Sequence, residues 1–323
     1  MEYNVLGRTG MKVSELCFGT LSFGGDADEA TSAAMFKQCR DAGINFFDCA
    51  NVYTNGRAEE ILGKLIADCR DELVITSKVF GRTGEHANAG GLSRRHVVQA
   101  VEDSLRRLNT DRLDIYFVHQ YDVHTPIEEV VDVVDELVRQ GKILYPAVSN
   151  WSAWQTAKAI GVAERKDKVR FACLQPMYNL TKRQAEVELL PLADSEGLGV
   201  IPYNPVGGGL LAGKYSKGAK PKSGRLVENS MYATRYHGDV FFEVAERFVA
   251  HAKERDVHPV SLAVAWVGAH PAVTAPIIGA RNPEQLQASL AAVDVNMTAE
   301  WRAEISDLSP PPAVATDRSE ERP

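Results

Sequence analysis

The sequence predicts an α/β fold in which eight parallel strands alternate with helices, a (β/α)8 TIM barrel with an N-terminal β-hairpin at the barrel bottom. The strand candidates are continuous apolar runs rather than polar–apolar alternations, as expected for parallel strands buried on both faces. Amphipathic stretches with helix start and stop signals separate them. The chain of 323 residues is also long enough for such a barrel, which commonly takes roughly 250 residues or more.

The strand candidates are short and mostly bounded by polar or turn residues. They span residues 14–19, 44–48, 73–78, 113–119, 144–149, 171–175, 199–203 and 275–279. Before them, residues 3–13 (YNVLGRTGMKV) form a candidate hairpin that could close the barrel bottom. A doubly wound sheet is the alternative fold. It is disfavoured because the turn from Gly19 to Gly25 lacks the glycine spacing of a dinucleotide-binding fingerprint.

Several of the intervening helices have recognisable end signals. Ser93 is a suitable N-cap for the amphipathic stretch that follows it. Pro126 is predicted at the first position of the next helix, and Gly141 lies just past the end of that helix. Asn282 and Pro283 open the last barrel helix in the same way. These signals place helices between the strands and support the alternating pattern.

Three segments differ from a plain strand–helix repeat. Pro191 is expected to kink or end a helix that begins near Thr181. Residues 204–240 form a long segment rich in Gly, Lys and Ser, and a loop of that length in a compact domain is usually functional. The last residues, 309–323, are predicted to be a disordered tail, which leaves residues 1–308 as a single domain.

The composition narrows the class of protein. Apolar residues make up 45% of the chain and charged residues 24%, which is ordinary for a soluble globular protein. The net charge of −7 argues against a nucleic-acid partner. The five cysteines form no CxxC pair and are interpreted as buried thiols in a reducing, cytoplasmic compartment. No signal peptide and no apolar run of ~18 residues is present, so no membrane association is predicted.

Four polar side chains follow the apolar runs of the first 120 residues. Asp48 ends one strand candidate, Tyr53 lies in the next loop, Lys78 ends a second candidate and His119 ends a third. In a barrel, the carboxyl ends of the strands meet at one rim, where active sites form. Each residue alone could be structural: a turn residue, a packing residue, a solvated lysine or an inert histidine. The set of four on three successive strands predicts a site.

The chemistry of this set is that of a proton donor. A phenol has a pKa near ~10 and is a weak acid unless its anion is stabilised, which a lysine ammonium can do. Asp48 would keep Lys78 charged and oriented, and His119 would orient a carbonyl oxygen or relay a proton. Such a donor suits a carbonyl that accepts a hydride. Because side chains supply no hydride, the set implies a nicotinamide cofactor.

The chain resembles a known family, the aldo-keto reductases. Within that family it resembles the branch that includes the bacterial short-loop enzymes and the potassium-channel β-subunits. The resemblance extends from about residue 6 to residue 308. It rests on FFDCANVYTNGRAEEILGK, on GLSRRHVVQAVEDSLRRLNTDRLDIYFVH, and on VSNW, LQPMYN, YNPVGGGLLAGKY and IIGARNPEQL, which follow in the family's order. The resemblance implies a (β/α)8 barrel, with Tyr53 as general acid in a tetrad with Asp48, Lys78 and His119.

The resemblance also implies an extended NADP(H) along the C-terminal rim. Three residues would bind the carboxamide, Tyr203 would stack on the nicotinamide, the 204–214 segment would wrap the pyrophosphate, and residues from 279 onwards would hold the adenosine end. The implied cofactor residues are Gly19, Thr20, Ser149, Asn150, Gln175, Tyr203, Asn204, Gly208, Leu210, Lys214, Gly279, Arg281, Gln285 and Ser289.

Physical arguments support several of these assignments. The amides of Asn150 and Gln175 offer the paired donors and acceptors that read a carboxamide. The ring of Tyr203 offers a flat apolar face. Arg281 precedes a helix N-terminus and could bind a ribose 2′-phosphate through two donors, which favours NADPH over NADH. Ser289 is shorter than the residue that relatives often carry, which would weaken the adenine contact.

The substrate pocket is predicted beside the tetrad and next to the 204–240 segment. Its further lining residues would be Phe23, Phe80, Gln120 and Trp151. Gln120 replaces a frequent arginine and could tune specificity. Residues 208–214 read as GxxxxGK, but Tyr215 replaces the hydroxyl residue of a phosphate-binding P-loop. No metal is predicted, because the sequence has no HExxH motif and no cysteine cluster.

Together these observations predict an NADPH-dependent reductase of aldehydes or ketones. Two alternatives stay open. The same barrel could work mainly as an alcohol or sugar dehydrogenase, with Tyr53 as base, or it could be a cofactor-binding regulatory subunit like the channel β-subunits. The expected partners are a small carbonyl or alcohol substrate and, because relatives differ in assembly, a second copy of the chain in a homo-oligomer.

Overall fold

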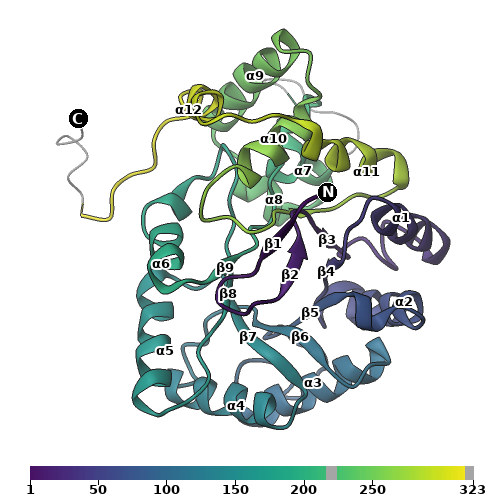
Figure 1. Ribbon diagram of the computed structural model, residues 1–323, viewed down its shortest axis with the longest axis vertical. Coiled ribbons are helices and arrows are strands. Elements are labelled where there is room, and N and C mark those ends of the chain that lie inside the picture. Colours follow the sequence, from purple (N-terminus) through teal and green to yellow (C-terminus); the bar gives the residue numbers. More distant parts are fainter. Residues whose placement is uncertain (216–223, 317–323) are drawn as a thin grey trace.

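The computed structural model describes residues 1–215 and 224–316, and its core is a barrel of eight parallel strands. Neighbouring strands pair in the order β10-β3-β4-β5-β6-β7-β8-β9 (Figure 1). The strands are β3 (Cys17–Gly19), β4 (Phe46–Asp48), β5 (Val74–Val79), β6 (Leu113–Val118), β7 (Ile143–Ser149), β8 (Cys173–Gln175), β9 (Gly199–Val200) and β10 (Ile277–Ile278).

Backbone hydrogen bonds between the first and last members of this order close the sheet. The amide of Ile277 donates to the carbonyl of Pro202 at 2.9 Å, just past β9, and the amide of Thr274 donates to Val200 at 2.8 Å. The predicted (β/α)8 barrel is therefore confirmed. All residues of β5 and β6 are buried, which agrees with strands covered on both faces.

Helices surround the barrel (Figure 1). They are α1 (Glu29–Asp41), α2 (Arg57–Ile66), α3 (Arg94–Leu108), α4 (Ile127–Arg139), α5 (Ala153–Arg165), α6 (Leu189–Glu196), α7 (Arg225–Glu228), α8 (Ser230–Arg235), α9 (Asp239–Glu254), α10 (Pro259–Gly268), α11 (Pro283–Leu290) and α12 (Ala299–Ser306). Short 3-10 turns are η1 (Tyr53–Gly56), η2 (Arg70–Glu72), η3 (Gln184–Glu186), η4 (Gly207–Ala212) and η5 (Ala291–Asp294).

The N-terminal hairpin covers the end of the barrel where the strands begin. It consists of β1 (Tyr3–Val5) and β2 (Lys12–Ser14), which pair antiparallel. Leu6, at its turn, is fully buried and packs in the cluster that fills the barrel interior. Gly7 lies so close to β9 that a Cβ there would approach the amide nitrogen of Gly199 to 2.4 Å. The predicted hairpin at the barrel bottom is thus confirmed, and the opposite rim is left open for a site.

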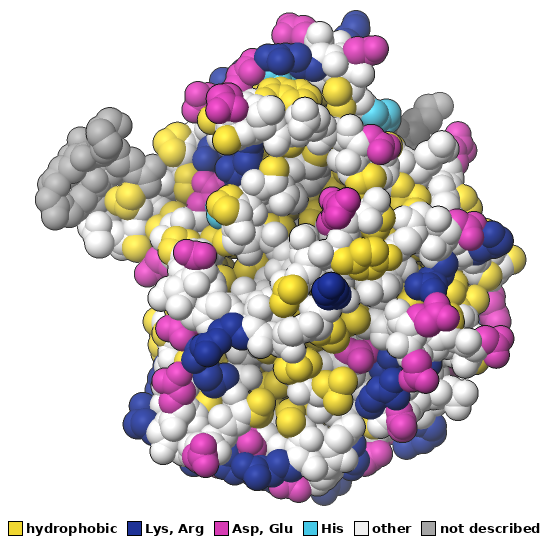
Figure 2. Space-filling model, in the orientation of Figure 1, with side chains coloured by type: hydrophobic (Ala, Val, Ile, Leu, Met, Phe, Trp, Pro, Cys, Tyr) yellow, Lys and Arg dark blue, Asp and Glu magenta, His cyan; other side chains and the backbone are white. Residues whose placement is uncertain are grey.

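Figure 2 shows the face that carries the hairpin. Among the described residues on this face, basic and acidic side chains are interspersed, and neither kind forms a separate patch. No helix among the described residues is both long enough and apolar enough to span a bilayer. Within those residues, no group of three or more His, Cys, Asp or Glu side chains is arranged to hold a metal ion.

Some predicted boundaries were wrong for local reasons. The strand predicted from residue 14 begins at Cys17, because Ser14 pairs with Tyr3 in the hairpin. Pro126 is the N-cap of α4 and not its first helical residue. The helix expected near Thr181 is absent from that position: η3 occupies part of the segment, and α6 begins only at residue 189. Pro191 falls in the first turn of α6, where its missing amide hydrogen costs no helical bond.

The long segment after β9 is more structured than a loop. Within residues 204–240 lie η4, α7 and α8, whereas residues 216–223 of the predicted segment lie outside the described part of the chain. The predicted tail is likewise only partly described, up to residue 316. Its beginning contacts the barrel, because Gln184 Nε2 donates to the carbonyl of Ala313 at 3.4 Å.

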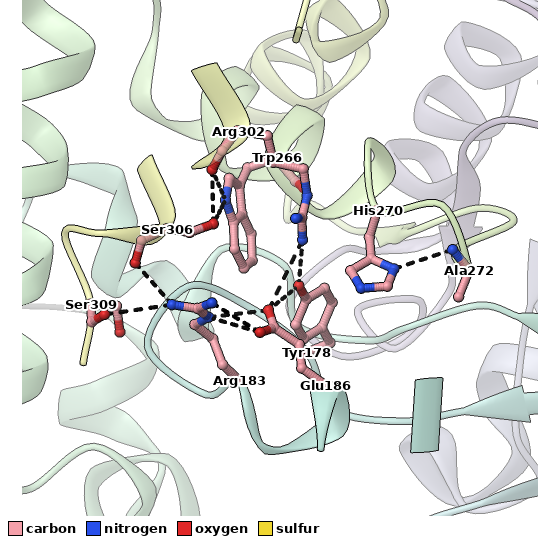
Figure 3. A network of polar contacts seen from close by, with 9 residues as sticks. All are labelled: Tyr178, Arg183, Glu186, Trp266, His270, Ala272, Arg302, Ser306 and Ser309. Atoms are coloured by element: carbon pink, nitrogen blue, oxygen red, sulfur yellow. Dashed lines mark hydrogen bonds and ion pairs between the residues drawn. The ribbon is translucent and has the colours of Figure 1, made fainter. Parts of the chain in front are cut away.

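A polar network fastens α12 to the loop after β8 (Figure 3). Arg183 forms an ion pair with Glu186 at 2.9 Å and donates to the carbonyl of Ser306 at 2.8 Å. Arg302 donates to the hydroxyl of Tyr178 at 2.8 Å, and its guanidinium lies 4.9 Å from the ring centre of Trp266. These contacts anchor the C-terminal helix on the outside of the barrel.

Candidate active site

The ends of β4 and β5 place an aspartate and a lysine in direct contact inside the open rim. Asp48 is the last residue of β4, and its register partner in β5 is Thr76. Because side chains alternate along a strand, Lys78 points to the same side as Thr76, one layer nearer the rim. Lys78 Nζ lies 2.6 Å from Asp48 Oδ2 and 2.7 Å from Asp48 Oδ1, and both side chains are buried.

The Asp48 carboxylate is fully engaged by its neighbours. Its Oδ1 accepts hydrogen bonds from Thr76 Oγ1 at 2.7 Å and from Gln175 Nε2 at 2.9 Å, in addition to the bond from Lys78. The backbone carbonyl of Asp48 accepts from Thr20 Oγ1 at 3.0 Å. Residues from β5 and β8 therefore hold this carboxylate in one orientation, and Thr20, just past β3, holds the backbone of Asp48. A buried charge destabilises the fold unless a counter-ion and hydrogen bonds such as these compensate its lost hydration.

Lys78 connects the carboxylate to the phenol of Tyr53. Its Nζ donates to the Cys49 carbonyl at 2.7 Å and to the Tyr53 hydroxyl at 3.3 Å. Burial acts to lower the pKa of Lys78, but the charge of Asp48 beside it raises that pKa, and the net shift is upward. The lysine is accordingly an ammonium at neutral pH, and its charge faces the phenol.

Tyr53 is held by an unusual turn. Thr54 and Asn55 adopt positive φ values of 47° and 56°, and Thr54 Oγ1 donates to the carbonyl of Phe23 at 2.8 Å. Burial raises the pKa of Tyr53 above its ordinary value, and the Lys78 charge opposes this without reversing it. Lys78 thus acts on this pKa in the predicted direction, but burial, which the sequence did not reveal, outweighs it. In the resting site the phenol stays protonated, which is the form that can donate a proton.

His119, just past β6, completes the four-residue cluster. Its ring centre lies 6.4 Å from that of Tyr53, with the two planes at 77°. Burial and then the nearby Lys78 charge lower the pKa of His119 to about 4. A neutral imidazole can orient an oxygen by donating one N–H bond. It is poorly suited to the alternative role of proton relay, because it gains a proton only in acid.

This lowered pKa leads to a stability prediction. Folding favours the neutral ring, so the contribution is fully present above the ordinary pKa of about 6.5 and is lost as the pH falls towards 4. We expect about 2 kcal/mol of the free energy of unfolding to be lost from His119 between about pH 7 and about pH 5. Urea unfolding of the wild type and of His119→Gln, which cannot titrate, measures this difference. Identical pH dependence in both proteins would contradict it.

The ends of β7, β8 and β9 form the neighbouring part of the rim. Ser149 Oγ donates to the Gln175 carbonyl at 2.9 Å, and Asn150 Nδ2 donates to the His119 carbonyl at 2.9 Å. The hydroxyl of Tyr203 donates to Asn150 Oδ1 at 2.8 Å. Asn150 has a φ of 57°, a left-handed conformation that asparagine tolerates. The structure thus brings these four predicted cofactor residues together beside the cluster.

The turn after β9 is built from glycines in left-handed backbone conformations. Gly208 and Gly209, like Asn204, have positive φ values, and the Gly208 amide donates to Asn204 Oδ1 at 2.5 Å. Asn204 Nδ2 in turn donates to the Tyr236 hydroxyl at 2.7 Å. Leu210, also predicted as a cofactor residue, is fully buried and packs in the hydrophobic core. Asn179 was missed by the sequence analysis, although its Nδ2 donates to the Asn204 carbonyl and supports this turn.

The predicted adenosine end lies around the start of α11. Gly279 and Gln285 are exposed, and Gln285 Oε1 accepts from the Arg281 amide at 3.2 Å. Arg281 is already paired with Asp26 at 3.0 Å and with Glu228 at 3.1 Å, and neither acid was predicted. Ser289, the last residue predicted at the adenosine end, is buried, and Gly19, predicted beside the cofactor, is half-buried. Lys214 is exposed at the end of the glycine turn.

Two of the four predicted substrate-pocket residues are not available at the rim. Phe23 is fully buried and packs against Phe18, with ring centres 5.8 Å apart. Trp151 is 4% exposed and packs against Phe171 in the layer between the sheet and the helices. Both turned inward because a large apolar side chain gains more from burial than from an open rim. The other two predicted residues keep exposed surface: Phe80 is half-buried and Gln120 is exposed.

The sequence analysis also missed Thr76, which binds Asp48. A signal was present: Thr76 lies two residues before Lys78 in the same strand, and period-two alternation places both on one face. No comparable signal existed for Asp26 and Glu228, because they are 202 positions apart in the chain and meet only at Arg281.

A TIM barrel with a buried lysine–aspartate pair beside a phenol at its open rim defines an oxidoreductase barrel. The chain belongs to the aldo/keto reductase family, whose sequence model matches residues 15–310. It is 40% identical over 302 residues to a probable voltage-gated potassium channel subunit beta of Arabidopsis thaliana, covering 91% of this chain and 92% of the relative. It is 37% identical over 331 residues to the uncharacterized oxidoreductase YrpG of Bacillus subtilis strain 168, covering 98% of each.

Proposed function

We propose that this oxidoreductase is an NADPH-dependent reductase of aldehydes or ketones, with Tyr53 as the general acid. The observation that carries the proposal is the position of Lys78 Nζ, which contacts both the Asp48 carboxylate and the Tyr53 hydroxyl. A phenol that is protonated at rest yet faces a fixed ammonium can release its proton when a neighbouring oxygen becomes negative, because the ammonium stabilises the phenolate that remains.

A bound nicotinamide dinucleotide would supply the hydride. The residues along the rim match the successive parts of such a dinucleotide. Ser149, Asn150 and Gln175 offer hydrogen bonds to the carboxamide, and the ring of Tyr203 offers a flat face to the nicotinamide. The glycine turn at 207–209 would lie at the pyrophosphate. The turn matters because glycines lack a Cβ, so the backbone there can lie close to a pyrophosphate. Gln175 would also link the carboxamide end of the cofactor to the acid, since its Nε2 already donates to Asp48.

In the reductive direction the carbonyl oxygen of the substrate would accept one hydrogen bond from Tyr53 and one from the neutral His119 ring. These two donors fix the orientation of the carbonyl and stabilise the negative charge that develops on its oxygen. The Tyr53 proton then passes to that oxygen, and the Lys78 ammonium, which Asp48 keeps charged and in place, stabilises the resulting phenolate. Burial of Asp48 and Lys78 keeps water away from their charges.

Turnover assays with a panel of carbonyl compounds and alcohols test this proposal. Each compound is combined with NADPH, NADP, NADH or NAD, and the absorbance of the reduced nicotinamide is followed. We expect turnover of aldehydes or ketones with NADPH and slower oxidation of alcohols with NADP. Faster alcohol or sugar oxidation would instead support the dehydrogenase alternative. Binding of a dinucleotide without turnover of any compound would contradict an enzymatic role.

That last outcome would favour a second candidate function, a cofactor-binding regulatory subunit. Its support is the 40% identity to a protein named as a probable channel β-subunit. The contacts among Asp48, Lys78 and Tyr53 favour catalysis over pure scaffolding, because a scaffold has no use for a buried proton donor. A small-molecule substrate, a cytoplasmic location and assembly into a homo-oligomer are part of the same proposal.

A further inference from the structure

We propose that Asp26 and Glu228 set the cofactor preference of this protein by counteracting Arg281, so that NADPH is preferred over NADH by less than Arg281 alone would give. The inference rests on the proposed function, because it concerns the same cofactor site. The sequence predicted that the Arg281 guanidinium would bind the 2′-phosphate. In the structure this guanidinium already has two carboxylate partners, which the sequence did not predict.

Two carboxylates face one edge of the Arg281 guanidinium, and the three groups form a triad. Nε of Arg281 lies 3.0 Å from Asp26 Oδ2, and Nη2 lies 3.1 Å from Glu228 Oε2. Asp26 belongs to the loop after β3, and Glu228 is the last residue of α7. A phosphate that binds through the Nε–Nη2 edge must displace a carboxylate, and one that binds through the Nη1–Nη2 edge meets a guanidinium whose charge is already offset by two acids.

Charge acts in the same direction. Lys214 lies beside the start of α7, because a Cβ at Gly224 would approach Lys214 Nζ to 3.1 Å, and Arg225 is the first residue of that helix. Arg281 meets the last residue of the same short helix at Glu228. Together with the two acids that pair with Arg281, these three cations have a net charge of +1. Replacing one acid by its amide would raise this local charge to +2 and make the region more attractive to a doubly charged phosphate.

The two acids can also bind NADH, the cofactor that lacks the 2′-phosphate, by accepting a hydrogen bond. A ribose 2′-hydroxyl is a hydrogen-bond donor, and a carboxylate is the acceptor that dinucleotide-binding sites commonly provide for it. The side chains of Asp26 and Glu228 are 49% and 46% exposed, so each has an oxygen that can meet such a hydroxyl. The same two residues that work against the 2′-phosphate can therefore support NADH.

Direct binding of NADPH and of NADH, measured by calorimetry, tests the inference without any turnover. In Glu228→Gln and in Asp26→Asn we expect the ratio of NADPH affinity to NADH affinity to rise roughly threefold, and in the double variant roughly tenfold. The pair 2′,5′-ADP and 5′-AMP should show the same change, because the difference lies at the adenosine end. Arg281→Ala should shift the ratio the other way.

Two surface acids outside the rim provide matched controls for net charge. Glu304→Gln and Asp41→Asn each remove one carboxylate from an ion pair, with Arg255 and Lys37 respectively, and should leave the ratio unchanged. A merely structural role of the triad would weaken both dinucleotides equally and leave the ratio at the wild-type value, which would overturn the inference. Failure of the wild type to bind any dinucleotide would overturn the proposed function itself.

Discussion

Replacement of Tyr53 by phenylalanine is expected to reduce kcat for carbonyl reduction by about 10²- to 10⁴-fold, the usual contribution of a positioned general acid. The change removes one hydroxyl from the site and leaves the ring. The Lys78–Asp48 ion pair does not depend on that hydroxyl, because Lys78 keeps its bonds to both carboxylate oxygens and to the Cys49 carbonyl. Affinity for the dinucleotide should therefore stay within a factor of about two.

Steady-state kinetics and direct cofactor binding measure these two effects separately. Tyr116→Phe is a matched control, since Tyr116 is fully buried outside the site and its hydroxyl has no hydrogen-bond partner among the described residues. That variant should keep wild-type turnover and lose no stability, because an unpartnered buried hydroxyl does not stabilise the fold. Tyr53→Phe with near-wild-type kcat would mean that another group donates the proton, and the mechanism would have to be abandoned.

Replacement of Asp48 by asparagine is expected to destabilise the protein and abolish most of its activity. The change leaves the Lys78 ammonium buried without its counter-ion, which typically costs about 3–5 kcal/mol of the free energy of unfolding. To avoid that cost, Lys78 would tend to lose its proton, and the charge that stabilises the Tyr53 phenolate would disappear. Urea unfolding and kcat/KM measured on the same preparation report the two losses together.

A second substitution separates stability from catalysis. In Asp48→Asn combined with Lys78→Met both charges are gone, so much of the lost stability should return while turnover stays low. Asp114→Asn is the reverse control: it removes a buried acid that pairs with Arg70 at 2.8 Å near the start of β6, far from the rim. It should reduce stability and keep turnover. If Asp48→Asn retained wild-type turnover, Asp48 would have no part in maintaining the acid.

Much of the fold was readable from local patterns. The continuous apolar runs predicted strands such as β5 and β6 because parallel strands bury both faces, and a serine N-cap placed the start of α3. Errors occurred where the chain gives a weak local signal. Ser14 was assigned to a barrel strand although it pairs in the hairpin, and a helix was expected near Thr181 where η3 and α6 lie. Whether such a segment forms a strand or a helix depends on the residues it meets in the fold and not on its own secondary-structure propensity.

The site divides in the same way. The residue types that end the strands can be read from the chain, and barrel topology then requires that Asp48, Lys78 and His119 meet at one rim. The protonation states and the partners of these residues became known only from the folded protein. Burial keeps the Tyr53 phenol protonated and the His119 ring neutral, and folding brings two distant acids to Arg281. The physical reason is that desolvation and charge pairing depend on distances in space, which no spacing along the chain encodes.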